Sequence, residues 1–247
     1  MSDEVMRALN NCRLSHLSSL ARGFDGSTTT KLLGPQILCY VSWQRQFLMM
    51  KELANAGTWR KMTVEDYGIS SSMVHRADYH LLTLPHLTQL SPVRNLVRLV
   101  LLIGDIAAFI GLPSGPLFVP RLSVQLKGAL RAVNLCDLPN LGDEVVRLIL
   151  WACFYGVELS IGLAEHPWFL LYLRQSQRIL GLHQPAEVLA LLVSFMYTEK
   201  QFFKISAIVW KDASGEESGR GREQRHTRSI HYDLQRLSLV HIVAGTS

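Results

Sequence analysis

Three charged residues on one predicted helix are the best candidates for binding chemistry in this sequence. Arg94, Arg98 and Asp105 follow one another at intervals of four and seven residues. This spacing places their side chains along one stripe of an otherwise apolar helix. The stripe could contact a ligand or a partner protein. An exposed or internally paired polar seam is the simpler interpretation of the same spacing.

The sequence contains no motif that identifies a catalytic or metal site. The four cysteines are far apart, and no two of them have CxxC spacing. His75, His80 and His86 occur in one stretch without carboxylates at ligand spacing, so we interpret them as surface or capping residues. A Gly-rich phosphate loop and an HExxH motif are both absent, and helix capping explains Glu165 and His166. We therefore expect a protein that binds no cofactor and is not an enzyme.

The composition is that of a globular protein that needs no disulfide or metal for stability. The chain has 247 residues, of which 48% are hydrophobic and 18% charged, and its net charge is +5. This charge is too mild to indicate nucleic-acid binding by itself. The chain starts without a secretory signal, and its most apolar stretches, 95–111 and 145–163, each contain two charged residues. We therefore expect an intracellular location and no membrane span.

One apolar segment is expected to form the centre of the fold. Residues 143–161 are hydrophobic on almost every face, which is typical of a buried helix. Asn140 and Asp143 are candidates for its N-cap, and Gly162 can end it. Trp151 lies in the middle of this segment and is expected to be a buried anchor.

The segments around the central helix also favour helices. Pro167 suits the first position of a new helix, and Trp168 is expected to anchor it in the core. Boundary signals and apolar spacing predict further helices over 3–21, 35–56, 91–110, 122–133 and 168–180, and another from Pro185. Residues 24–30 predict a loop, and 58–90 are less regular because Pro85 should break a helix there.

The C-terminal part of the chain differs from the rest. After Trp210, residues 213–247 begin with a polar, Gly-rich stretch, and they contain five arginines against four acidic residues and one aromatic residue, Tyr232. They predict a solvated, disordered tail. Since no strand alternation is found, the sequence predicts an all-α protein, with a single multi-helix domain over 1–212 around the buried central helix.

Several segments follow one another in a recognisable order. An arginine-led apolar helix precedes a leucine-rich helix with a central Trp, then a Pro-Trp-Phe restart, an aromatic-rich run and a late Trp. These segments are Arg98–Leu102, Glu144–Trp151, Phe154–Gly156, His166–Leu170, Leu192–Tyr197 and Trp210. In this order they resemble the regulatory domain of fungal transcription factors of the six-cysteine zinc-cluster class. The resemblance is best over 90–212 and weaker before residue 90.

The resemblance implies an all-helical regulatory module of a nuclear factor, which acts through protein partners of the transcription machinery, a DNA-binding factor, or an effector. The chain departs from that family because it lacks the zinc cluster that binds DNA, so we expect no sequence-specific DNA binding of its own. The apolar excess leaves room for a homodimer. The alternative is a helical enzyme or small-molecule-binding protein, with a pocket between helices near Arg94, Arg98 and Asp105.

Overall fold

The computed structural model of the chain describes residues 19–55, 63–106, 118–197, 205–206 and 209. These residues contain helices and no strand, so the expected all-α fold class is confirmed. The helices are η2 (Arg22–Phe24), α2 (Ser27–Asn55), α3 (Val64–Leu87), α4 (Pro92–Asp105), α5 (Phe118–Ala132), η4 (Leu135–Asn140), α6 (Asp143–Leu159), α7 (His166–Ile179) and α8 (Pro185–Ser194). All of them belong to a compact unit of residues 1–207. Trp210 and the predicted tail lie outside the described residues.

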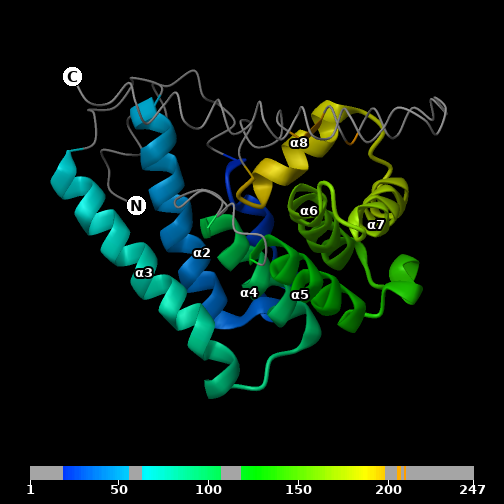
Figure 1. The fold of residues 1–247 in the computed structure, drawn as a ribbon, viewed down its shortest axis with the longest axis horizontal. Helices are drawn as coiled ribbons and strands as arrows, with labels where there is room; N and C mark the ends of the chain where they lie inside the picture. Colours follow the sequence, from blue (N-terminus) through cyan, green and yellow to red (C-terminus); the bar gives the residue numbers. More distant parts are fainter. Residues whose placement is uncertain (1–18, 56–62, 107–117, 198–204, 207–208, 210–247) are drawn as a thin grey trace. The chain divides into compact units, whose positions relative to one another are not determined.

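Helix α6 is the buried centre expected from its composition. Nearly every side chain from Val146 to Leu159 is inaccessible to solvent, including Trp151. The helix packs against α7, α5, α4 and α2, and its contact with α7 is the most extensive (Figure 1). A helix that is apolar on all sides reaches this state only if neighbours cover each face.

The ends of α6 differ in part from the expected capping. Gly142, with φ of +81°, is the N-cap, and its carbonyl accepts the first helical hydrogen bonds. Asn140 instead donates to the carboxylate of Asp137, and Asp143 is already the first helical residue. A backbone in the left-handed region favours glycine over either polar candidate. Gly162, with φ of +78°, follows the end of the helix as expected.

The contact between α6 and α7 depends on a glycine. A Cβ at Gly156 would lie 2.1 Å from Cδ1 of Phe169, so the ring rests directly on the backbone of α6. Phe169 is fully buried. The close approach explains how two helices joined by a short connection share so much surface.

Aromatic rings fill the space around α6. The Phe24 ring packs edge-on against Trp151 and Phe195, with centroid distances of 5.5 Å and 5.1 Å. Tyr155 packs against Tyr197 in the same way at 5.1 Å. Edge-to-face pairs of this kind add about 0.5–1.5 kcal/mol each beyond the area they bury. The cluster joins η2, α6 and the residues after α8.

Trp168 is less buried than the sequence suggested. It is only half-buried, and its neighbour Phe169 occupies the fully buried position instead. Pro167 is the second residue of α7, which begins at His166. Adjacent residues of a helix point about 100° apart, so a one-residue difference decides which ring faces the core.

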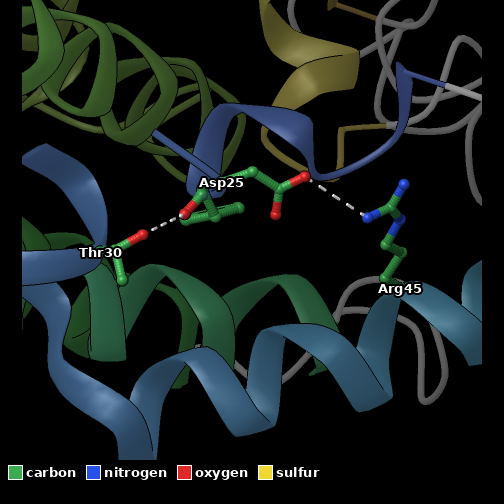
Figure 2. A network of polar contacts seen from close by, with 4 residues as sticks. Asp25, Thr30 and Arg45 are labelled. Atoms are coloured by element: carbon green, nitrogen blue, oxygen red, sulfur yellow. Dashed lines mark hydrogen bonds and ion pairs between the residues drawn. The ribbon is translucent and has the colours of Figure 1, made fainter. Parts of the chain in front are cut away.

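The loop predicted over 24–30 is wrong beyond residue 26, because α2 begins at Ser27. Figure 2 shows this corner, in which the Thr30 hydroxyl donates to the carbonyl of Phe24 at 3.5 Å. The same hydroxyl and the Thr30 N–H reach the carbonyl of Gly26, at 2.9 and 2.8 Å. An ion pair of 3.7 Å between Asp25 and Arg45 spans the corner. These contacts outweigh the turn preference of a Gly-Ser-Thr sequence.

Residues 64–87 were expected to be irregular, but they form the long helix α3, which lies beside α2 (Figure 1). Pro85 lies inside the helix near its end instead of breaking it. A proline costs its helix one hydrogen bond and clashes with the preceding turn.

Most of the other predicted helices are found with changed boundaries, whereas the helix predicted over 3–21 lies almost entirely outside the described residues. Ser91 caps α4, because its hydroxyl accepts the N–H of Arg94 at 3.3 Å. Helix α5 begins at Phe118, four residues before the expected start at Leu122. Pro185 opens α8 as expected, with a capping box between Gln184 and Glu187. Among the described residues, no helix has both the length and the apolar character that a membrane crossing requires.

We expect Gly156→Ala to lower the free energy of unfolding by about 1–3 kcal/mol, because the new methyl group collides with the Phe169 ring. Gly128→Ala is the matched control. Gly128 is exposed in α5 with nothing within 4 Å of its Cβ position, and the change should stabilise the helix slightly. Urea denaturation followed by circular dichroism measures both, and equal stability of the two variants would contradict the described packing of α7.

Candidate functional site

The charged stripe predicted from the sequence lies on α4, which packs against α2, α3, α5 and α6. The apolar side of α4 is buried, with Val97, Val100 and Ile103 fully inaccessible. Arg94, Arg98 and Asp105 each reach a different part of the two long helices, α2 and α3. Within the described part of the chain no hydrogen bond or ion pair joins these three side chains to one another.

Arg94 contacts α2 at a kink. Gly34 has φ of +75° and ψ of 167°, so the helix is interrupted there and restarts at Pro35. The Nε of Arg94 donates to the carbonyl of Leu32 at 2.6 Å, and a terminal nitrogen donates to that of Lys31 at 3.4 Å. A Cβ at Gly34 would lie 3.2 Å from the guanidinium, so glycine also makes room for it.

Arg98 contacts α3 in a similar way. One terminal nitrogen donates to the carbonyl of Leu81 at 3.2 Å. Its other donors hold the side-chain oxygen of Asn95, at 3.2 and 3.0 Å. Partial burial lowers the pKa of Arg98 because it disfavours the charged form, and these three hydrogen bonds offset that cost.

The two arginines share a physical role. In an α-helix the carbonyl of residue i accepts the N–H of residue i+4. The residues four positions after Lys31 and Leu81 are Pro35 and Pro85, which have no N–H to donate. Arg98 therefore donates to a carbonyl that Pro85 has left without its helical partner. Arg94 donates to the carbonyls just before the interruption of α2 at Gly34 and Pro35. The polar seam expected from the spacing is internally paired at this end.

Asp105 ends the stripe inside the protein. Its side chain is 3% exposed, and the side-chain nitrogen of Gln44 in α2 donates to its Oδ1. Burial raises the pKa of Asp105 well above its ordinary value, because the charged form loses its hydration. The preceding residue, Gly104, lies against Tyr155, whose hydroxyl would be 2.9 Å from a Cβ there. Asp105 is thus buried and paired with α2, and the residue before it lies against α6.

Two polar atoms of α2, one of them on Gln44, are buried without a partner in the part of the chain that the structure describes. The hydroxyl of Tyr40 and the Oε1 of Gln44 have no hydrogen-bond partner among the described residues. Tyr40 and Gln44 are one turn apart on α2 and share a face of that helix. Buried groups of this kind cost stability unless they are paired.

The other candidates for chemistry do not converge. His75, His80 and His86 are exposed on α3, and the described residues contain no group of three or more His, Cys, Asp or Glu side chains that could hold a metal ion. His166 faces Ser160, with 3.2 Å between Nδ1 and Oγ. Complete burial raises the pKa of the Cys153 thiol, which keeps it protonated and unreactive.

A surface arrangement that the sequence did not reveal lies between α5 and α7. The Nζ of Lys127 is 5.4 Å and the guanidinium carbon of Arg131 is 5.8 Å from the centre of the Trp168 ring. Both cations come from one face of α5, four residues apart. Their spacing on a helix was visible in the sequence, but their pairing with Trp168 needed the packing of α7.

The chain was compared with protein families, curated proteins and solved structures. No family model matches the chain, and no curated protein or solved structure matches it.

Arg98→Ala should destabilise the fold by about 1–3 kcal/mol, because the carbonyl of Leu81 is left unpaired. In a Pro85→Ala background the same change should cost less, since position 85 then has an N–H that can donate to this carbonyl. Urea denaturation of the four proteins gives the coupling energy. Arg76→Ala, an exposed change on α3, is the control and should be additive with Pro85→Ala. Additivity of Arg98→Ala with Pro85→Ala would refute the proposed role of Arg98.

Asp105→Asn tests the buried carboxyl. In the unfolded chain this carboxyl ionises at about pH 3.9, whereas in the folded protein it stays protonated to a higher pH. The free energy of unfolding is therefore unaffected below the unfolded pKa and falls as the pH rises from there towards the folded pKa. The native chain should therefore lose about 1.4 kcal/mol per pH unit, relative to Asp105→Asn, until the folded carboxyl ionises. Urea denaturation at several pH values measures the difference. A difference that does not vary with pH would show that Asp105 does not carry this linkage.

Proposed function

We propose that this chain is a helical regulatory module that influences transcription through a partner protein or an effector, without a DNA-binding cluster of its own. The proposal starts from the resemblance of residues 90–212 to the regulatory domain of fungal zinc-cluster transcription factors. It includes nuclear residence, little sequence-specific DNA affinity and no catalytic activity or cofactor. A homodimer stays a further prediction.

One structural observation supports this proposal above the others. The described segments that carry the resemblance come from separate places in the sequence and pack together around α6. Phe169 of α7 lies on Gly156, and Phe195 and Tyr197 pack on Trp151 and Tyr155. The segment from Arg98 to Leu102 belongs to α4, which packs against α6. These segments thus belong to one core, as the parts of a single regulatory module would.

The position of Asp105 favours an effector as a second candidate mode of action. Gln44 of α2 contacts the buried Asp105 of α4, and the Oε1 of Gln44 and the hydroxyl of Tyr40, one turn away on α2, lack partners among the described residues. Binding pockets of small molecules combine an apolar lining with a few such groups. This observation fits an effector-binding regulator and equally the alternative of a small-molecule-binding protein.

A tethering experiment tests the proposal. We expect the chain, fused to an unrelated DNA-binding domain, to change transcription of a reporter several-fold relative to that domain alone. Gly156→Ala should reduce the effect because it disrupts the core, and Gly128→Ala should not. Equal reporter output with and without a well-expressed, folded chain would contradict the proposal. If a metabolite then raised the melting temperature of the chain, the small-molecule alternative would be favoured instead.

A further inference from the structure

The surface between α5 and α7 has properties that the fold does not require. Val124 and Leu171 leave 57% and 51% of their surface exposed, and Ile179 leaves 36%. Leu171 is three residues after Trp168, so the two are neighbours on α7. Lys127 is likewise three residues after Val124, so these two are neighbours on α5. We call the set Val124, Lys127, Arg131, Trp168 and Leu171 the Trp168 surface.

The charge of this surface has one sign. The sequences of α5 and α7 contain Arg121, Lys127, Arg131, Arg174 and Arg178 and no acidic residue. Within the part of the chain that the structure describes, neither Lys127 nor Arg131 forms an ion pair. A cation over an aromatic ring keeps its full charge and its N–H donors, so both can still bind a carboxylate.

The two halves of the surface limit what can bind. Its cations require an acidic partner, whereas the exposed Val124 and Leu171 need apolar side chains to cover them. Nucleic acid would satisfy the charges but would leave these aliphatic groups uncovered, and it is usually bound by denser basic clusters. Trp and Arg are also the residue types most enriched where proteins bind one another.

We propose that the Trp168 surface binds an acidic, amphipathic helical segment of a partner protein. Aliphatic or aromatic residues of that segment lie against Val124, Trp168 and Leu171, and its Asp or Glu side chains bind Lys127 and Arg131. This proposal deepens the proposed function, on which it rests, by naming the docking surface and the chemistry of the partner. The binding itself is measurable without any reporter.

The test uses the full chain and a labelled synthetic peptide of about four helical turns, with Leu and Phe on one face and Asp and Glu beside them. We expect fluorescence anisotropy to report binding that weakens as salt is added. Lys127→Glu/Arg131→Glu should weaken it at least tenfold, and Leu171→Ser should weaken it without changing the salt dependence. Lys127→Gln/Arg131→Gln, which keeps most of each side chain, covers the case in which the charge reversal unfolds the protein.

The controls separate this surface from general charge attraction. Arg22→Glu/Arg76→Glu removes the same net charge from exposed positions in η2 and α3 and should leave the affinity unchanged. A peptide with serine in place of Leu and Phe should bind much more weakly. Equal losses in the two double variants, or no binding of the amphipathic peptide, would overturn the proposal.

A labelled oligonucleotide provides the remaining comparison. Tighter binding of the oligonucleotide than of the peptide, lost in Lys127→Glu/Arg131→Glu, would overturn the proposal and assign the surface to nucleic acid. An active tethered module that does not bind the peptide removes this inference and leaves the proposed function standing. Peptide binding by a chain that is inactive in the reporter assay would contradict the proposed function and leave the docking surface standing.

Discussion

Helical hydrogen bonding is interrupted at Gly34 and Pro35 in α2 and at Pro85 in α3, and α4 donates hydrogen bonds to the backbone carbonyls left before these points. The carbonyls of Lys31 and Leu81 precede Pro35 and Pro85 by four residues, and Arg94 and Arg98 of α4 donate to them. The bond to Leu81 is partly buried, where an unpaired carbonyl would cost about 1–3 kcal/mol, whereas the bond to Lys31 is exposed. The two arginines therefore fix α4 against both long helices by hydrogen bonds that have a defined direction, which apolar packing lacks.

Helix α4 thus has two dissimilar sides. One side buries Val97, Val100 and Ile103. The other holds α2 and α3 by polar contacts that end at the enclosed Asp105. Because both arginines are already engaged by backbone carbonyls, a partner that binds this protein through positive charge has better access to α5 and α7. An effector would instead have to reach the buried groups beside Asp105.

In helix α7, the burial of one aromatic residue leaves the preceding one partly exposed. Phe169 fills the space over Gly156, and the resulting contact with α6 is set by the missing side chain of that glycine. With Phe169 turned inward, Trp168 is left half-buried beside Lys127 and Arg131. The same helix therefore supplies a rigid core contact and an exposed aromatic residue in a basic setting. Rigid support of this kind lowers the entropic cost of binding a partner.

Local patterns in the amino-acid sequence are enough to predict the all-α class, the buried central helix and the starts of α4, α6 and α8, because apolar spacing and Ser-Pro or Pro signals act locally. The sequence could not pair Arg94 with Pro35 or Arg98 with Pro85, which are 59 and 13 residues apart in the chain. For the same reason it predicted a break at Pro85 and a loop over 24–30, where tertiary hydrogen bonds and local side-chain contacts sustain helix. Whether Trp168 or Phe169 faced the core was decided only by the tertiary structure, since that choice depends on the rotation of α7 against Gly156.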